Sequence, residues 1–309
     1  MPLVECVPNI SEGRRALVID ALAKASAVPG VHVLDQSSDP SHNRTVFTIV
    51  GEARPLQHAV LNLFAAAIAH IDLRHHRGVH PRIGAVDVVP FVPLDGATLD
   101  ECVDLARQTA QLVAQRYDVP IYLYAAAALR ADRRSLADIR RGGFEGLQAK
   151  MREDAWMPDF GPSRPHPTAG ASAIGARTIL VAYNVNLASN RLDVATRIAR
   201  KVRASRGGLN HVKAMGVPLE HLGIVQVSMN LTDYRQTSMT TVFDAVQREA
   251  ALDGVPVLGS EIVGLVPADA LPADPVERLK LSATDAGRVL EQRLQRSTQS
   301  TLSSPRKPT

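Results

Sequence analysis

The segment richest in chemically useful side chains is RHHRGVHPRIGAVD, residues 74–87. Its charged or titratable members are Arg74, His75, His76, Arg77, His80, Arg82 and Asp87. The interspersed glycines and proline disfavour a helix or a strand, so a loop is expected. Histidine titrates near neutral pH, and a loop of this composition is therefore suited to proton transfer. A solvated basic loop without chemistry has the same composition.

A metal site is the second interpretation of this segment, because His75, His76 and His80 offer three nitrogen ligands. The neighbouring arginines repel a divalent cation, and no helix places two of these histidines on one face. We therefore expect no metal.

Two further polar segments stand out. Asp35 and the following QSSDPSHNR contain Asp39, His42, Asn43 and Arg44, and alone they predict a turn between two strands. The stretch DFGPSRPHPTAGASAIGAR, residues 159–177, is rich in glycine and proline. It reads either as a linker or as a stiff loop that lets backbone approach a ligand, and its basic residues favour the ligand loop.

The elements that must position these segments alternate in type. The strands LVECVP, VHVLD, TVFTIVG and AVDVVPFV, with helices after Ser11 and around residues 56–67, give the order βαββαβ. A helix capped by Thr98 and Glu101, ending near Tyr117, and the strand VPIYLY follow. In the second half TILVAYNVNL, HVKAMGV, GIVQVSMNL and VPVLGSEIVGL, with two more helices, repeat the order.

This order predicts an α+β fold of two ferredoxin-like (split βαβ) subdomains, each a mixed or antiparallel sheet with helices on one face. We expect the subdomains at residues 1–177 and 178–290. Residues 291–309 are rich in Ser, Thr, Pro and basic side chains, which predicts a disordered tail.

Composition narrows the functional class. With 309 residues, 45% of them hydrophobic, the chain can form a substantial core, and neither a signal peptide nor a membrane-spanning stretch is recognisable. The two cysteines are too few for a disulfide framework. We expect a cytoplasmic protein that binds neither membrane nor nucleic acid, because the net charge of +4 is scattered and aromatic residues make up only 4%.

Seven segments together carry a resemblance to a known family. They are LVECVPNISEG, NRTVFTIVG, HPRIGAVDVVPFVPL, VPIYLY, WMPDFGP, GARTILVAYNVNL and EIVGLVP, in this order over residues 3–267. The chain thus resembles the formiminotransferase family, which includes the transferase part of formimidoyltransferase-cyclodeaminases.

The resemblance implies a homodimeric enzyme whose two subdomains enclose a folate tunnel. Its expected reaction moves a formimino group from N-formimino-L-glutamate to N5 of tetrahydrofolate, the co-substrate, within histidine degradation and one-carbon metabolism. The family's catalytic histidine corresponds to His80, the histidine of HPR. The family's folate-contacting loop corresponds here to Gly161, Pro162, Ser163, Arg164, Pro165, His166, Pro167, Thr168, Ala169 and Gly170, although its middle, RPHPTA, departs from the animal members.

The implied substrate is a cationic amidine with two carboxylates, which suggests roles for further residues. Asp35, Asp39 or Asp87 suits the amidine, Arg44 and Arg82 suit the carboxylates, and Asn43 lies between these groups in the sequence. Ser37 stands where animal members carry an acid that helps to position the histidine, which leaves Asp39 and Asp35 as the two candidates to replace it here. The resemblance leaves His75 and His76 as loop or substrate-positioning residues.

Three alternatives remain open at this point. The first is formyl transfer between 5-formyltetrahydrofolate and glutamate on the same scaffold. The second is a folate carrier without catalysis, and the third is a metal-dependent amidohydrolase.

Overall fold

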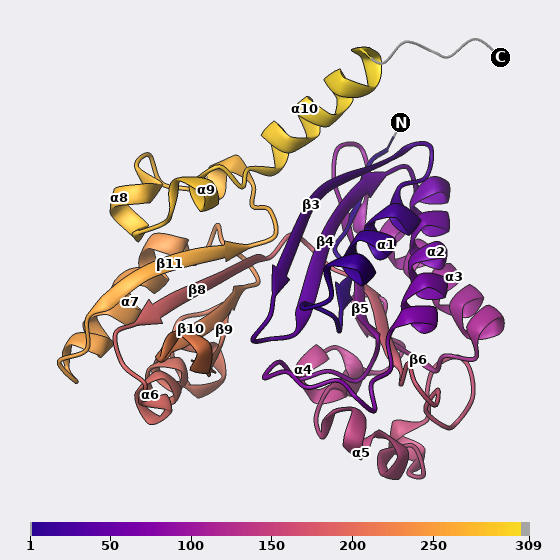
Figure 1. Ribbon diagram of the computed structural model, residues 1–309, viewed down its shortest axis with the longest axis horizontal. Helices are drawn as coiled ribbons and strands as arrows, with labels where there is room; N and C mark the ends of the chain where they lie inside the picture. Colours follow the sequence, from indigo (N-terminus) through magenta and orange to yellow (C-terminus); the bar gives the residue numbers. More distant parts are fainter. Residues whose placement is uncertain (1, 304–309) are drawn as a thin grey trace. The chain divides into compact units, whose positions relative to one another are not determined.

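The computed structural model describes residues 2–303 and divides into two compact units, residues 1–178 and 179–309 (Figure 1). Over the described range, no helix combines the length and the apolar character needed to cross a membrane. Both cysteines, Cys6 and Cys102, are buried free thiols.

The first unit is a single mixed sheet with helices on both sides. Its strands are β1 (Val4–Cys6), β2 (Asn9–Ile10), β3 (Val31–Asp39), β4 (Arg44–Gly51), β5 (Val86–Pro93), β6 (Ile121–Ala125) and β7 (Ser172–Ala176). Its helices are α1 (Ala16–Ser26), α2 (Ala53–His70), α3 (Leu99–Tyr117), α4 (Leu136–Ile139) and α5 (Gly143–Lys150), with 3₁₀ turns at Ala131–Arg133 and Asp154–Trp156.

Strand pairing in this unit follows and then extends the predicted βαββαβ order. β3 pairs with β4, and both β1 and β2 lie between β4 and β5 in antiparallel pairs. β7 then joins β5 to β6, with parallel pairing on both sides. β7 is absent from the sequence prediction, because four of the five residues of SAIGA are small and lie inside a stretch that reads as a loop. Gly175 explains the composition, since a Cβ there would overlap the carbonyl oxygen of Tyr124 on β6.

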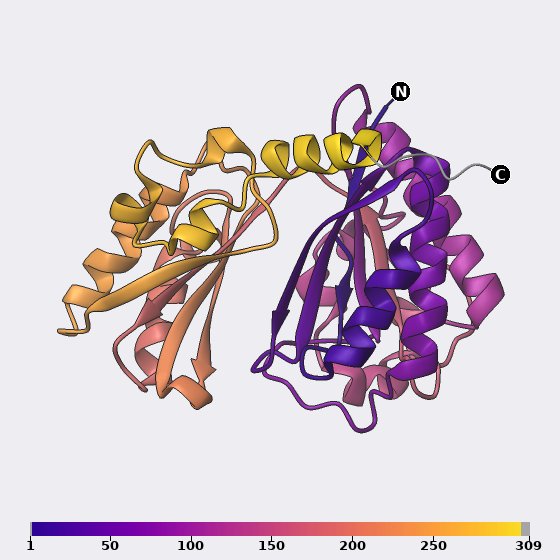
Figure 2. The same ribbon diagram turned by 45° about the horizontal axis from the view of Figure 1, so that its top comes forward.

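The expectation that helices cover only one face of each sheet is wrong for the first unit. α1, α2 and α3 cover one face, over a core that includes Phe47, Ile49 and Phe91 (Figure 2). On the other face, α4 and α5 pack over Tyr122 and Tyr124. Alternate residues of a strand point to opposite faces, so a strand with large side chains on both faces needs cover on both.

The predicted start of α3 is confirmed. Thr98 accepts a hydrogen bond from the Glu101 backbone N–H, and the Glu101 side chain accepts one from the Thr98 backbone N–H, which completes the capping box. The helix ends at Tyr117, and Asp118 follows in the left-handed conformation.

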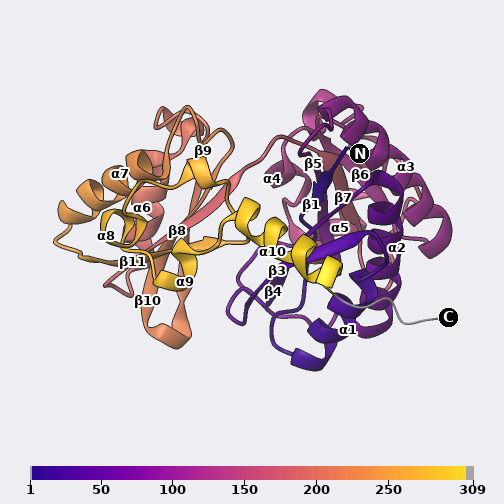
Figure 3. The same cartoon turned by 90° about the horizontal axis from the view of Figure 1, so that it is seen from above.

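The second unit has the predicted βαββαβ order. It contains β8 (Val181–Leu187), α6 (Leu192–Val202), β9 (Val212–Leu219), β10 (Ile224–Leu231), α7 (Met239–Ala251) and β11 (Val257–Val263), with 3₁₀ turns at Ala204–Arg206, Glu220–Leu222 and Ala268–Ala270. The sheet order is β11-β8-β10-β9, antiparallel throughout. α6 and α7 lie side by side over a core that includes Tyr183, Val227 and Phe243 (Figure 3).

The chain continues beyond β11 through α8 (Pro275–Leu279), α9 (Ala283–Ala286) and α10 (Leu290–Ser303). α10 occupies most of the segment for which the sequence predicts disorder, so over residues 291–303 the structure differs from that prediction. The start of the helix is anchored, because Leu290 N–H donates to Val266 O at 2.9 Å and Glu291 accepts from Ala268 N–H at 3.0 Å. The remainder of the predicted tail, residues 304–309, lies outside the described residues.

Gly84 allows the loop before β5 to lie directly against the chain before β7. It forms a bridge with Gly170, and a Cβ at Gly84 would overlap the carbonyl oxygen of Ala171. We expect Gly84→Ala to lower the free energy of unfolding by about 2 kcal/mol or more, because backbone must move to make room. Denaturant unfolding measures this change.

Gly146 provides the matched control. It lies within α5, and a Cβ there would meet nothing within 4 Å. Gly146→Ala should therefore leave stability unchanged or raise it by up to about 1 kcal/mol. Equal stability of the Gly84→Ala variant and the parent chain would contradict the close approach at residue 84.

Candidate functional site

The β3–β4 hairpin assembles one side of the candidate site. Its register places Asp39 opposite Arg44, on the sheet face away from Phe47 and Ile49 and therefore away from the core under α1–α3. Asn43 occupies the turn with a φ of +48°, a conformation that asparagine tolerates better than most residues.

Asn43 ties this hairpin to two other segments. Its Oδ1 accepts a hydrogen bond from Gly13 N–H at 2.9 Å, and its Nδ2 donates to Arg77 O at 2.9 Å. A further bond runs from Val79 N–H to Ser41 O at 3.2 Å. The loop that contains His80 is therefore held against the hairpin, which brings two of the polar segments of the sequence together.

His80 and Arg44 are in direct contact. Arg44 Nη1 lies 3.0 Å from His80 Nε2, and Arg44 also donates to Asn9 Oδ1 at 3.3 Å. A guanidinium has only donors, so His80 Nε2 must be the acceptor. His80 is therefore the neutral tautomer with its proton on Nδ1.

The surroundings of His80 disfavour its charged form. Burial, followed by Arg44, Arg140 and His42, lowers the pKa of His80 well below its ordinary value. Burial also lowers the pKa of Arg44, to about 10, a value at which Arg44 is still a cation at neutral pH. The pair thus consists of a fixed positive charge and a neutral imidazole that can act as a base.

An ion pair between Arg140 and Asp87 borders this contact. Arg140 donates to Asp87 Oδ2, while Asp87 Oδ1 accepts from Ile83 N–H at 2.7 Å. Asp87 is 2% exposed, so its charge is matched by Arg140 inside the protein. Sequence reasoning missed Arg140, because it directly follows the short helix α4 and no motif marks it.

His42 lies next to His80 in the same cluster. The ring centroids are 5.8 Å apart with 49° between the planes. His42 is 3% exposed, and its Nδ1 lies 3.5 Å from Asp39 Oδ2. Burial lowers the pKa of His42, Asp39 opposes that shift and Arg44 adds to it.

Arg82 and His76 form a second set of contacts in the same loop. Arg82 donates from Nε to His76 Nδ1 at 2.9 Å and forms two hydrogen bonds to the Glu145 carboxylate, at 2.8 and 3.1 Å. His76 Nε2 lies 2.9 Å from Asn43 O. Both nitrogens of His76 are thus engaged, whereas the His75 side chain is 84% exposed and 3.9 Å from Asp72.

Asp35 lies four residues before Asp39 on β3. It is opposite Thr48 in the register, and its Oδ2 accepts a hydrogen bond from Ser37 Oγ at 2.9 Å. The hairpin therefore places Asp39, not Asp35, in the row that contains Arg44.

The loop of residues 161–170 packs against the segment that carries His80. Its carbonyl oxygens on Thr168 and Ala169 accept from Leu73 N–H and Ala85 N–H, both at 2.9 Å. His166 closes the loop internally, because its Nδ1 accepts from Ala169 N–H at 3.0 Å and its backbone pairs with Gly170. Gly161, Ser163, Arg164 and Pro167 remain exposed at the surface.

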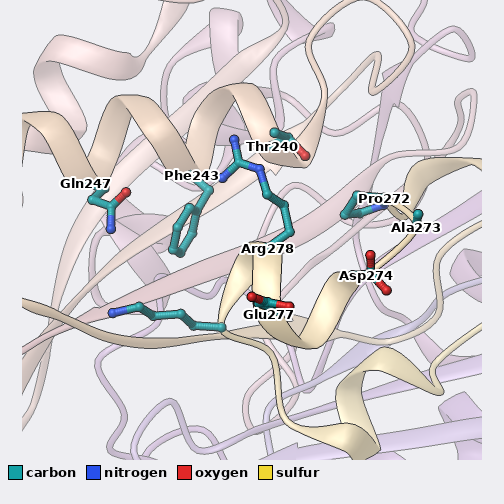
Figure 4. Close-up of a pocket in the computed structure, with 9 residues that line it drawn as sticks. Thr240, Phe243, Gln247, Pro272, Ala273, Asp274, Glu277 and Arg278 are labelled. Atoms are coloured by element: carbon teal, nitrogen blue, oxygen red, sulfur yellow. The ribbon is translucent and has the colours of Figure 1, made fainter.

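A surface pocket of about 550 Å³ lies elsewhere, in the second unit (Figure 4). Arg278 reaches from α8 toward α7 and forms two hydrogen bonds to Asp244, at 2.5 and 2.9 Å. The lining residues are Thr240, Phe243, Gln247, Pro272, Ala273, Asp274, Glu277, Arg278 and Lys280. None of them belongs to the cluster formed by His42, Arg44, His80, Asp87 and Arg140, which we call the His80 cluster. The candidate site is therefore this cluster, because of its side-chain chemistry, and not the pocket.

No group of three or more His, Cys, Asp or Glu side chains between residues 2 and 303 is arranged to hold a metal ion.

Comparison with known proteins gives this geometry a family context. Residues 3–177 match the N-terminal subdomain of the formiminotransferase domain, and residues 182–274 match the formiminotransferase domain. The chain belongs to the formiminotransferase family. His80 and residues 161–170 both lie in the part that matches the N-terminal subdomain.

Three relatives illustrate how far the similarity extends. The glutamate formimidoyltransferase of Streptococcus pyogenes serotype M1 is 47% identical over 87% of this chain and 90% of its own length. That of Thermoplasma acidophilum is 45% identical over 96% of this chain and 98% of its own. The formimidoyltransferase-cyclodeaminase of Sus scrofa is 46% identical over 87% of this chain, but over 51% of its own length.

The pKa shifts of the site predict how stability depends on pH in this family member. Burial lowers the pKa values of His42, His76, His80 and His166 in the folded chain. On acidification the unfolded chain takes up protons at these side chains first, near pH 6.5. Their contribution to stability is therefore complete above that pH and is lost as the pH falls toward the folded values.

We expect the free energy of unfolding to be lower by at least about 1 kcal/mol at about pH 5.5 than at about pH 7.5. Denaturant unfolding at the two pH values measures the difference, and His80→Asn should reduce it. A chain that is more stable at the lower pH would contradict the neutral, buried histidines.

Proposed function

We propose that this chain is a glutamate formimidoyltransferase, which moves the formimino group of N-formimino-L-glutamate to N5 of tetrahydrofolate and releases L-glutamate. The observation that carries the proposal is a neutral imidazole, His80, held at 3.0 Å by the cation of Arg44. Two relatives with that name, at 45% and 47% identity over most of their length, support the same reaction.

The chemistry requires one group that takes up a proton and then returns it. When N5 attacks the amidine carbon, a C–N5 bond forms, the π electrons of the C=N bond move to the imino nitrogen, and N5 must lose its proton. The lone pair of the former imino nitrogen then re-forms the C=N bond while the bond from this carbon to the glutamate nitrogen breaks. The electron pair of the broken bond stays on the glutamate nitrogen, which takes a proton. A neutral His80 can accept the first proton and deliver it in the second step.

Arg44 connects substrate binding to this proton transfer. While Arg44 donates to His80 Nε2, the only unprotonated nitrogen of the ring is occupied. A glutamate carboxylate is a stronger acceptor for a guanidinium than an imidazole is. In our proposal the substrate carboxylate takes over Arg44, which frees Nε2 of His80 and cancels the charge that lowers its pKa.

The remaining predicted residues receive different roles. Asp39 accepts from two backbone N–H groups and faces His42, and Arg82 is engaged by His76 and Glu145, so both are less available to a ligand than Arg44. Exposed backbone and Arg164 in residues 161–170 make that loop suitable for folate, next to the segment that carries His80. We also propose a cytoplasmic homodimer that acts in histidine degradation and one-carbon metabolism.

We expect the purified chain, mixed with N-formimino-L-glutamate and tetrahydrofolate, to form 5-formiminotetrahydrofolate. The assay contains a strong chelator, because no step requires a metal, and 5-formyltetrahydrofolate with glutamate is run as the alternative pair. Product from the formyl pair alone would replace the formimino reaction with formyl transfer. Folate binding without any turnover would indicate a carrier, and activity only without chelator would indicate a metal enzyme.

We expect His80→Asn to lower the rate of transfer by about 10² to 10⁴-fold, the usual contribution of a general acid–base group, while folding and folate binding persist. His75→Ala is the control, because that side chain is 84% exposed and outside the cluster. Near-normal turnover by His80→Asn would assign the proton transfer to another residue.

We expect residues 161–170 to exchange backbone hydrogen more slowly when a folate analogue is bound, because a ligand covers amides that are now exposed. The exposed turn at residues 252–254 serves as a control. Identical exchange of residues 161–170 with and without the analogue would remove this loop from the folate site.

A further inference from the structure

The His42 side chain is buried with half of its hydrogen-bonding capacity unused. It is 3% exposed, and its Nε2 has no hydrogen-bond partner among the described residues. A buried polar atom without a partner destabilises the folded chain, so its retention calls for an explanation. Nδ1, in contrast, lies 3.5 Å from the Asp39 carboxylate.

Asp39 is itself held in place. Its Oδ1 accepts hydrogen bonds from the backbone N–H groups of Ser41 at 2.7 Å and His42 at 2.9 Å, which leaves Oδ2 facing His42. A carboxylate can only accept, so the proton of neutral His42 belongs on Nδ1. Nε2 of His42 is therefore an unprotonated acceptor.

His80 offers the complementary donor. Because Arg44 occupies Nε2 of His80, the proton of that ring is on Nδ1. The two rings are neighbours, with centroids 5.8 Å apart. At this separation a nitrogen of each ring reaches hydrogen-bonding distance when the rings rotate to point these two nitrogens at each other.

We propose that His42 is a positioning residue for proton transfer: its Nε2 accepts the Nδ1–H of His80 when His80 becomes an imidazolium, with Asp39 holding the opposite nitrogen. This inference deepens the proposed transferase function and rests on it. Asp39, His42 and His80 then form a hydrogen-bonded triad. The negative charge of Asp39 at one end of the triad balances the positive charge that develops on His80.

The charges around His80 show why the Asp39–His42–His80 triad is needed. The charged or titratable groups facing His80 are Arg44, Arg140 and His42, and those facing His42 are Asp39, Arg44 and His80. Arg44 and Arg140 are fixed cations that oppose protonation of His80, and a protonated His42 opposes it as well, whereas a neutral His42 can accept a hydrogen bond from the imidazolium. The Asp39 carboxylate supplies a compensating negative charge. It acts on the His80 imidazole through His42, which lies between them.

The triad does not change the proton balance of the reaction. The proton from N5 goes to Nε2 of His80 and from there to the glutamate nitrogen. The Nδ1–H of His80 is shared with His42 but not transferred. His42 thus acts on the stability of the imidazolium, not on the substrate.

The test compares Asp39→Asn, His42→Leu and His75→Ala with the parent chain in the formimino transfer assay across pH. An asparagine keeps the Oδ1 bonds to the two backbone amides, but its amide N–H would donate to His42 Nδ1. This moves the proton of His42 to Nε2 and turns the acceptor into a donor. His42→Leu removes the acceptor entirely.

We expect both variants to lower kcat by about tenfold or more while KM stays within about twofold. The acid limb of the kcat profile should move to lower pH, because the imidazolium of His80 loses its partner. His75→Ala should match the parent chain. Unchanged kcat, or a lower kcat with an unmoved limb, would overturn the proposal, and the second result would give His42 only a structural role.

Two further measurements keep this test decisive. If thermal melting shows that His42→Leu does not fold, the near-isosteric Asp39→Asn decides alone. If the parent chain transfers no formimino group, the proposed function fails. The Asp39–His42–His80 triad is then tested by NMR titration of His80. The pKa of His80 should be lower in Asp39→Asn than in the parent chain, and an equal pKa in the two would refute the triad.

Discussion

The hydrogen bond from Arg44 to His80 Nε2 is the contact on which the rest of the site depends. It fixes the tautomer of His80, contributes to the lowered pKa of the ring, and occupies the nitrogen that accepts a proton in the proposed reaction. A basic imidazole in free solution would titrate near neutral pH and exchange between tautomers. Beside Arg44 it is held neutral until another acceptor engages the guanidinium, and a substrate with two carboxylates offers such an acceptor.

The fold serves this contact by bringing three distant segments of sequence together. The β3–β4 hairpin supplies Arg44, the loop before β5 supplies His80, and Asn43 joins the two through its side chain. The chain before β7 packs against the same loop through a backbone approach that only glycine permits at residue 84. Much of the first unit's polar structure therefore fixes the relative positions of a few side chains.

Most of the fold could be predicted from the sequence, because hydrophobic periodicity and one capping box determine its long elements. β7 could not, since four of its five residues are small and carry no strand pattern, and its strand character comes from close packing against Tyr124. For the site, the sequence identified the segments containing His80, Arg44 and Asp39 but not their contacts. Arg140 had no signal at all, because its importance comes from a tertiary ion pair with Asp87. The unpartnered nitrogen of His42 is likewise visible only in three dimensions.

The most direct test of this account is the ¹⁵N NMR spectrum of the His80 ring at neutral pH, with and without N-formimino-L-glutamate. The account predicts a neutral ring in the free chain, protonated at Nδ1 and with Nε2 accepting from Arg44. On substrate binding, the Nε2 signal should lose the shift caused by that donor, and the pKa of the ring should rise. A His80 ring that is already an imidazolium in the free chain, or that carries its proton on Nε2, would contradict the central claim.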